Sequence, residues 1–328
     1  MQRHHILVTG GAGFIGSHIC KALHQAGRIP VAFDNLSTGH SDNVRWGPLV
    51  RADLQDTSAL SSTIALYRPG CVIHCAANAY VGESVGNPQK YYDNNVGGSL
   101  ALLDTCLSSG LDRIVFSSSC ATYGIPLVLP ISEASEQIPI NPYGRTKLIF
   151  EMMLEDYAAA YGLKFAILRY FNAAGADPDG QLRERHDPET HLVPCALLAA
   201  AGRKDRLEVY GTDYATVDGT CVRDYVHVSD LAQAHVAAVS YLEGGQNTLS
   251  VNLGSGHGTS IRQVLDTIER LTRRPVPVAF KPRRAGDPPI LFADTTMARE
   301  TLGFNPVLSD IDTIIRTAAP SFGLEVRS

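Results

Sequence analysis

The sequence is short of charge and has no long apolar run. Charged residues make up 19% of its 328 residues, and the formal net charge is -5. A chain without a basic surplus lacks the electrostatic footprint of a nucleic-acid-binding protein, so we expect no nucleic-acid partner. No stretch approaches the length of a signal peptide or a membrane span. We therefore expect a cytoplasmic protein without membrane association.

Metal-ligand spacing is missing as well. The 7 cysteines are an odd and scattered set without a CxxC pair. Such a set is typical of reduced, mostly buried thiols rather than of disulfides or zinc ligands. The isolated histidines fit surface or core positions, so we expect no metal site.

Short apolar runs alternate with helical patterns through the first half of the chain. The strand-like runs are residues 6–8, 30–33, 71–74, 113–117 and 165–170. The segments with helical periodicity are residues 16–27, 58–67, 94–109 and 143–161. This alternation predicts an α/β fold with a doubly wound parallel sheet of the Rossmann type.

The alternation weakens after about residue 175, where polar, charged and proline residues accumulate. We therefore expect a nucleotide-binding domain over residues 1–175 and a smaller C-terminal substrate-binding lobe over residues 176–328. A segment near residues 225–245 is expected to return to the first domain.

A glycine-rich motif follows the first strand-like run. It begins at Thr9, reads TGGAGFIG, and contains Gly10, Gly11, Gly13 and Gly16. Glycines allow a tight turn and let backbone N–H groups approach a pyrophosphate at a helix N-terminus. A merely flexible glycine loop is the alternative, but the position between a strand and a helix favours a dinucleotide site.

Asp34 closes the second strand-like run, where an acid can accept hydrogen bonds from the adenosine ribose. Its carboxylate would repel a 2′-phosphate, and the next basic residue, Arg45, lies well beyond the strand end. The position favours NAD over NADP, with a simple turn residue as the alternative. Asp53 precedes a helical pattern and could be either an N-cap or an adenine contact.

Tyr143 and Lys147 are spaced so that both lie on one face of a helix. A neighbouring cation favours the phenolate, so Lys147 and a positive nicotinamide ring should lower the pKa of Tyr143 toward a value useful for proton abstraction. Ser119 follows the fourth strand-like run and is the candidate hydrogen-bond partner of a substrate hydroxyl. Alternatively, Tyr143 and Lys147 merely share a helix surface, and Ser119 forms hydrogen bonds only with the local backbone.

In this order the motifs resemble the extended short-chain dehydrogenase/reductase family, and within it the UDP-glucose/UDP-galactose 4-epimerases. The resemblance runs nearly end to end and rests on TGGAGFIGSH, FDNLSTG, HCAANAYVGESV, YYDNNVGGS, SSSCATYG, NPYGRTK, LRYFNAAGA, DGTCVRDYVHVSDLA and RRAGD. It implies a catalytic trio of Ser119, Tyr143 and Lys147. In the implied mechanism Tyr143 takes the proton of sugar O4 while C4 passes hydride to NAD+. The resulting 4-keto sugar turns over, and hydride returns to its opposite face.

The resemblance also implies binding residues and a homodimer. For NAD it implies the motif glycines together with Phe14, Ile15, Asp34, Asn35, Leu36, Ser37, Thr38, Gly39, Asp53, Leu54, Cys75, Ala76, Ala77, Asn94, Tyr143, Lys147 and Phe171. For the UDP-sugar it implies Ser119, Tyr143, Asn172, Leu192, Glu208, Val209, Tyr210, Arg223, Arg284, Asp287 and Leu291. The guanidinium groups of Arg223 and Arg284 suit a diphosphate. The alternative is that these arginines form surface salt bridges.

Several positions depart from what relatives carry. Cys120 and Ala121 stand where dehydratases of this family place an acid, which disfavours elimination of water. Ala79 replaces a familiar lysine near the cofactor, and His191 a familiar asparagine. Leu291 falls where many strict hexose epimerases have tyrosine, so the sugar pocket could admit a C2 N-acetyl group.

Other functions stay open at this point. The 4-epimerases of UDP-N-acetylglucosamine, UDP-xylose and UDP-glucuronate share the same machinery and are alternatives. A catalytically silent NAD-binding regulator is the alternative from another class, although such a protein would be expected to lose Tyr143 or Lys147.

Overall fold

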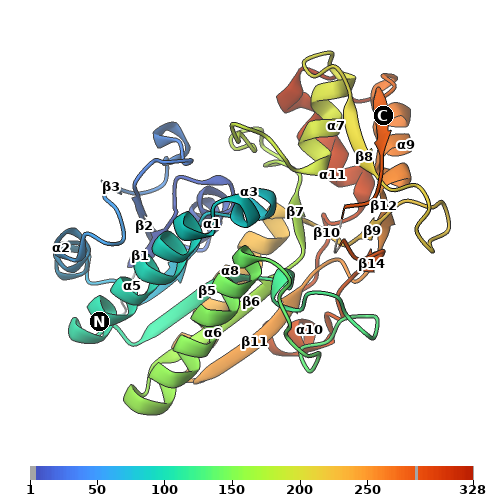
Figure 1. Ribbon diagram of the computed structural model, residues 1–328. Coiled ribbons are helices and arrows are strands. Elements are labelled where there is room, and N and C mark those ends of the chain that lie inside the picture. Colours follow the sequence, from blue (N-terminus) through green and yellow to red (C-terminus); the bar gives the residue numbers. More distant parts are fainter. Residues whose placement is uncertain (1–4, 285–286, 328) are drawn as a thin grey trace.

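The computed structural model describes residues 5–284 and 287–327, and its largest element is a seven-stranded sheet (Figure 1). The strands are β1 His5–Thr9, β2 Ile29–Asp34, β3 Leu49–Arg51, β4 Cys71–His74, β5 Arg113–Ser119, β6 Lys164–Tyr170 and β11 Thr248–Leu253. All neighbours are parallel, in the order β11-β6-β5-β4-β1-β2-β3. The order reverses between β1 and β4, the point where sheets of this kind bind ligands. The predicted Rossmann-type sheet is confirmed.

Helices cover both faces of the sheet because alternate strand side chains point to opposite sides. Ile6 and Val8 belong to one apolar layer, with α1 and α8. Leu7 belongs to the other layer, with α2, α5 and α6. These helices span Phe14–Gln25 (α1), Thr57–Tyr67 (α2), Gly98–Ser108 (α5), Pro142–Tyr161 (α6) and Val228–Glu243 (α8). The helix predicted over residues 94–109 is divided, because a π-helical segment, η2 (Tyr92–Gly97), leads into α5.

Two of the seven strands differ from the sequence prediction. Strand β3 is only three residues long, too short to stand out as an apolar run. Strand β11 comes from the second half of the chain and pairs with β6 from Thr248 opposite Phe165 to Leu253 opposite Tyr170. Helix α8, which precedes β11, packs against α1. The later part of the chain therefore completes both the sheet and one of its covering layers.

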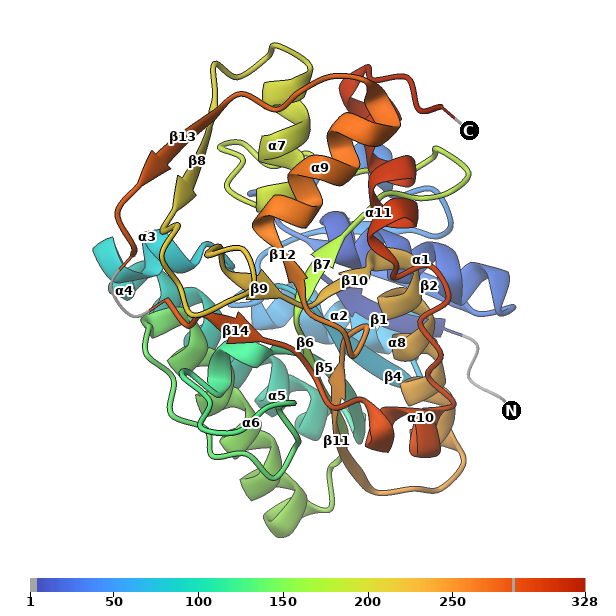
Figure 2. The ribbon, with the colours of Figure 1, turned by 90° about the vertical axis from the view of Figure 1, so that its right-hand side faces the viewer.

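The remaining elements form small sheets beside the carboxyl ends of the large one (Figure 2). Their strands are β7 Asn172–Ala174 with β10 Tyr225–His227, β12 Thr259–Ser260 with β9 Val222–Arg223 and β14 Ile290–Leu291, and β8 Leu207–Tyr210 with β13 Val278–Lys281. Helices α7 (Leu192–Ala200), α9 (Ile261–Thr272) and α11 (Ile311–Ala318) enclose a separate apolar core. The short elements are α3 Val81–Gly86, α4 Pro88–Tyr91, α10 Thr296–Leu302, η1 Ser41–Asn43, η3 Cys120–Thr122 and η4 Ala319–Phe322.

A membrane-spanning helix is not found: within residues 5–284 and 287–327, every helix is too short or too polar to cross a bilayer.

Candidate active site

The glycine motif forms a tight turn between β1 and α1. Gly10 has φ +71°, and a Cβ there would lie 2.7 Å from the backbone nitrogen of Ala76. A Cβ on Gly16 would meet the carbonyl oxygen of Gly10 at 2.1 Å, so only glycine allows the helix to approach the turn. No side chain caps the N-terminus of α1 at Gly13. Its first N–H groups therefore remain available to an anion, which fits the pyrophosphate of NAD.

Asp34 ties the glycine turn to the segment that follows β2. Its two carboxylate oxygens accept hydrogen bonds from the backbone N–H groups of Ala12 at 2.9 Å and Leu36 at 2.8 Å. Burial raises the pKa of Asp34, and these two hydrogen bonds oppose that rise. Next to it, the side chain of Asn35 donates to Asp53 at 2.8 Å. Acidic groups thus line this end of the site, where a 2′-phosphate would be repelled.

Ser119, Tyr143 and Lys147 come together although two different elements carry them. Ser119 ends β5, while α6 carries Tyr143 and Lys147. All three are nearly buried, with exposed fractions of 8%, 8% and 4%. Helix α6 begins where it does because the side chain of Asn141 caps it, accepting the N–H of Gly144 at 2.8 Å.

The lysine is fixed by the strand that carries the serine. Lys147 Nζ donates to the carbonyl oxygen of Ser117 at 2.8 Å and lies 4.8 Å from the ring centroid of Phe116. It lies 5.8 Å from the ring centroid of Tyr143. Its position and charge can therefore act on the tyrosine without a direct bond.

Burial dominates the electrostatics of the tyrosine and the lysine. It raises the pKa of Tyr143 to about 12, although a hydrogen bond with the Ser119 side chain lowers it. It lowers the pKa of Lys147 to about 8, against the raising effects of Cys75 and Glu151. The sequence analysis expected a lowered pKa for Tyr143. In the protein alone the pKa is raised, because desolvation of the phenolate outweighs the nearby polar groups.

A buried network behind the trio was missed by the sequence analysis. Ser117 Oγ lies 2.8 Å from His235 Nε2 and 3.1 Å from Cys75 Sγ. His235 belongs to α8, so the returning helix supports the strand that presents Ser119. A histidine within an apolar helical pattern gives little sign of such a role, because the partner is far away in the sequence.

Asn95 is a second residue that the sequence analysis missed. Its side chain accepts the N–H of Asn78 at 2.8 Å and donates to the carbonyl oxygen of Asn78 at 3.0 Å. It also donates to Thr146 Oγ1 at 3.0 Å, and Asn94 donates to it at 2.9 Å. Asn95 thereby joins the loop after β4, the π-helical segment and α6. The paired asparagines of YYDNNVGG are the only signal for it in the sequence.

Five of the residues nominated for the UDP-sugar form one contacting pair and one contacting group of three, all in the part of the chain after residue 175. Arg223 on β9 pairs with Asp287 at 2.5 Å. The guanidinium carbon of Arg284 lies 3.9 Å above the ring centroid of Tyr210, whose hydroxyl donates to Glu208 at 2.6 Å. Positively and negatively charged side chains therefore lie together in this part of the chain.

Four other nominated residues are positioned differently. Val209 is buried in the apolar core that α7, α9 and α11 enclose, so only its backbone can contact a ligand. Leu192 begins α7 and packs partly against the same core. Leu291 packs against the buried cluster that includes Phe171 and Tyr123. The side chain of Asn172 donates to the carbonyl oxygen of Asp224 at 2.8 Å.

The comparisons with known proteins agree with this geometry. A profile described as the NAD dependent epimerase/dehydratase family matches residues 6–254. The UDP-glucose 4-epimerase of Rhizobium meliloti (strain 1021) is 51% identical over 93% of this chain and 93% of its own.

Solved structures give the same result. The UDP-glucose 4-epimerase of Brucella ovis in complex with NAD is 62% identical, with a TM-score of 0.97 over 99% of this chain and 100% of its own. The UDP-Glc/GlcNAc 4-epimerase of Campylobacter jejuni is 38% identical, with a TM-score of 0.85 over 97% of this chain and 99% of its own. The chain therefore belongs to the NAD dependent epimerase/dehydratase family.

Proposed function

We propose that this protein interconverts UDP-glucose and UDP-galactose by inverting C4 of the sugar through a 4-keto intermediate. The observation that carries the proposal is the buried trio of Ser119, Tyr143 and Lys147, at the carboxyl end of β5 and on the first turns of α6. Two relatives that are 51% and 50% identical to this chain carry the name UDP-glucose 4-epimerase, which supports the choice of sugar.

Each member of the trio has a separate task in this proposal. Tyr143 takes the proton of sugar O4 and returns it after inversion, and Ser119 positions the same oxygen by a hydrogen bond. Lys147 holds positive charge close to the phenol and also orients the cofactor ribose. NAD+, which the glycine turn, Asp34 and Lys147 would hold, would supply the hydride acceptor and donor for C4.

Burial of Tyr143 makes the nearby positive charge necessary. With a pKa of about 12 in the protein alone, the phenol holds its proton at neutral pH. The charge of Lys147 and that of the oxidised nicotinamide both favour the phenolate. Proton abstraction is therefore coupled to the presence of the cofactor in its oxidised form.

A dehydratase reaction needs a free acid beside the sugar, and the neighbouring buried acid is already paired. Glu151 accepts a hydrogen bond from Ser118 and forms an ion pair with Arg169 at 2.8 Å. The side chain of Gln137 also donates to Glu151 at 2.8 Å. A carboxylate that already accepts hydrogen bonds from an arginine and two further donors is not free to serve a sugar, which supports epimerisation over elimination.

The substrate would bind between the two parts of the chain. We assign cofactor binding to residues 1–175 and sugar-nucleotide binding mainly to residues 176–328. Arg223 and Arg284 offer guanidinium forks for the diphosphate, and Asp287 can accept hydrogen bonds from the uridine ribose. Arg223 would then exchange part of its contact with Asp287 for the phosphate oxygens.

A second candidate activity is 4-epimerisation of UDP-N-acetylglucosamine. The observation that favours it is Leu291, which packs next to Phe171 where a bulkier tyrosine would narrow the pocket. The Campylobacter jejuni relative is named as a UDP-Glc/GlcNAc 4-epimerase. UDP-xylose and UDP-glucuronate remain further alternatives for the same machinery.

The test is to incubate the purified protein separately with UDP-glucose, UDP-N-acetylglucosamine and UDP-xylose, without added NAD, and to follow C4 inversion by proton NMR. Turnover without added cofactor is expected, with UDP-glucose the fastest substrate. Silence toward all three substrates, even after NAD is added, would contradict the proposal and favour the NAD-binding regulator.

The cellular compartment and the oligomeric state of the enzyme are also proposed. All seven cysteines are free thiols, which suits the reducing cytoplasm. Helices α5 and α6 expose apolar side chains, namely Leu100, Leu107, Met152 and Tyr161. Exposed apolar residues on two neighbouring helices support a homodimer formed through this face. Sedimentation equilibrium would test this state.

A further inference from the structure

Residues 176–191, here called the strap, connect β7 to α7 and cross over to the cofactor-binding part of the chain. At one end, Asp177 pairs with the buried Lys21 of α1 at 2.6 Å. Further along, Arg185 pairs with Asp42 at 2.6 Å, and its carbonyl oxygen lies 2.9 Å from His40 Nε2. The strap is thus attached to α1 and to the segment after β2.

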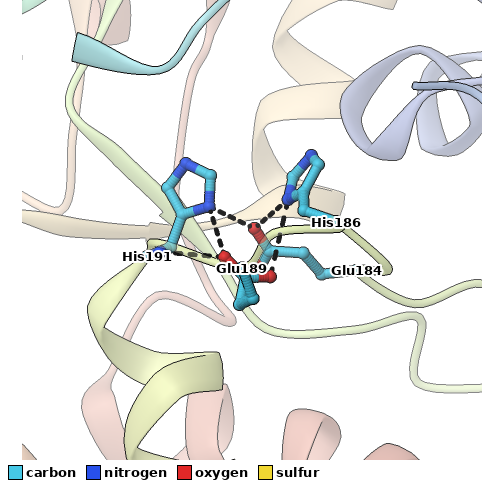
Figure 3. A group of neighbouring side chains, drawn as sticks. All are labelled: Glu184, His186, Glu189 and His191. Atoms are coloured by element: carbon cyan, nitrogen blue, oxygen red, sulfur yellow. Dashed lines mark hydrogen bonds and ion pairs between the residues drawn. The ribbon is translucent and has the colours of Figure 1, made fainter. Parts of the chain in front are cut away.

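Four side chains of the strap converge on one point, as Figure 3 shows: Glu184, His186, Glu189 and His191. Their ligand atoms all lie within 4.8 Å of one another. The two carboxylates are nearly buried, and both imidazoles turn Nδ1 toward them. The sequence analysis expected no metal site, because it sought cysteine pairs and did not examine the E-x-H-x-x-E-x-H spacing.

The distances within this cluster match a coordination shell. Glu184 lies 3.0 Å from Nδ1 of both His186 and His191, and Glu189 lies 3.6 Å and 2.9 Å from the same two nitrogens. Ligands about 2.0–2.2 Å from a tetrahedral zinc ion stand roughly 3.3 Å apart. Only a small adjustment would therefore place four ligand atoms around one cation.

One nitrogen atom of the cluster has no hydrogen-bond partner. His186 Nδ1 is buried and makes no hydrogen bond, although a carboxylate oxygen of Glu184 lies 3.0 Å away. A buried nitrogen that faces acceptors without a well-directed bond is costly unless something satisfies it. A cation between the nitrogen and the carboxylates would do so.

We propose that these four strap side chains bind one divalent transition-metal ion of the Zn²⁺ class. Two imidazoles and two carboxylates are a ligand set that suits such ions, and four protein ligands leave no open position. The site is therefore structural rather than catalytic.

The ion would hold the strap against the cofactor site. The ring of His186 lies 6.3 Å from the ring of Phe14, at the start of α1, and 5.8 Å from the ring of Tyr80. His191 immediately precedes α7 and is its N-cap. An ion that fixes these two histidines holds the glycine turn, the loop after β4 and the start of α7 together. Because the glycine turn belongs to the proposed cofactor site, metal binding slows the release of NAD.

A proton-filled cluster is the competing state. Burial lowers the pKa of His186 and His191, but the neighbouring carboxylates of Glu184 and Glu189 outweigh it and raise the values to about 9 and about 10. Two imidazolium groups would then neutralise two carboxylates without any metal. A metal ion must displace these protons, so the experiment has to distinguish the two states.

The test uses the NAD-bound protein, dialysed first against Zn²⁺ and then against metal-free buffer. Elemental mass spectrometry is expected to find one zinc ion per chain, and chelation is expected to speed the release of NAD. His186→Gln should weaken Zn²⁺ binding at least about tenfold in isothermal titration. This variant is chosen because His186 Nδ1 makes no hydrogen bond, and His257→Gln, at an exposed position of the second lobe, is the control.

Three results would overturn the proposal. The first is a wild-type protein that binds no Zn²⁺ in the titration, which would assign the cluster to paired charges. The second is His186→Gln binding Zn²⁺ as tightly as the wild type. The third is NAD release that does not change on chelation, which would remove the role of the ion as a clamp. None of these outcomes depends on which sugar the enzyme inverts.

Discussion

The proposed cofactor-binding half and the proposed second lobe display different groups for binding. In the first, backbone groups carry the site, since the glycine turn and the uncapped start of α1 are presented by strands buried on both faces. In the second, strands of two to four residues present charged side chains such as Arg223 and Glu208. A backbone site tolerates little change in shape. A side-chain site can be altered residue by residue, so substitutions in the two regions should affect different steps.

The largest effect is expected from Tyr143→Phe. Removing the proton acceptor should lower kcat by about 10²–10⁴-fold, because general base catalysis contributes that much. Bound NAD should remain, since the backbone site is untouched. Steady-state kinetics and cofactor content after gel filtration measure the two effects. Tyr161→Phe, exposed near the end of the same helix, is the control. Full activity in Tyr143→Phe would refute the proposed mechanism.

Gly16→Ala should come next. The added methyl group would meet the carbonyl oxygen of Gly10, so we expect a loss of about 1–3 kcal/mol in the free energy of unfolding. The occupancy of NAD should fall as well, because the turn must move. Gly82→Ala, which has nothing within 4 Å of the added Cβ, should change neither quantity. Denaturant unfolding together with cofactor content would detect an unexpected tolerance at Gly16.

In the second lobe, Arg223→Lys should raise KM about tenfold while kcat changes less, because lysine cannot form the guanidinium fork. The NAD content should stay that of the wild type. Arg203→Lys, at an exposed position of the same lobe, serves as the matched control. Loss of cofactor from Arg223→Lys would break the separation between the two regions.

The smallest effect concerns sugar choice. Leu291→Tyr should shift the ratio of kcat/KM for UDP-N-acetylglucosamine over UDP-glucose downward by roughly a few-fold, because the ring would narrow the pocket. Leu291→Met keeps the side-chain volume and should leave the ratio unchanged. An N-acetyl-sugar activity that is equal in wild type and Leu291→Tyr would show that this leucine does not shape the pocket.

The sequence allowed most of the cofactor half to be predicted. Five strands and the glycine turn follow from local patterns, because buried strands leave a regular spacing. The meeting of Ser119 with Tyr143 was expected from the family resemblance. Strand β11 was missed, because nothing in its six residues indicates that they pair with β6. The pairing of Arg223 with Asp287 was missed for a related reason. Contacts between residues distant in sequence depend on the tertiary fold, which local periodicity does not encode.

The late arrival of β11 has a consequence for synthesis on the ribosome. Until Leu253 has emerged, β6 is an edge strand of seven residues with one row of backbone groups unpaired. The apolar face that α8 covers is exposed until α8, which ends at Glu243, has emerged. Nascent chains stopped between β6 and β11 would therefore expose an unpaired, aggregation-prone sheet edge. Chaperones that bind such edges should capture these chains.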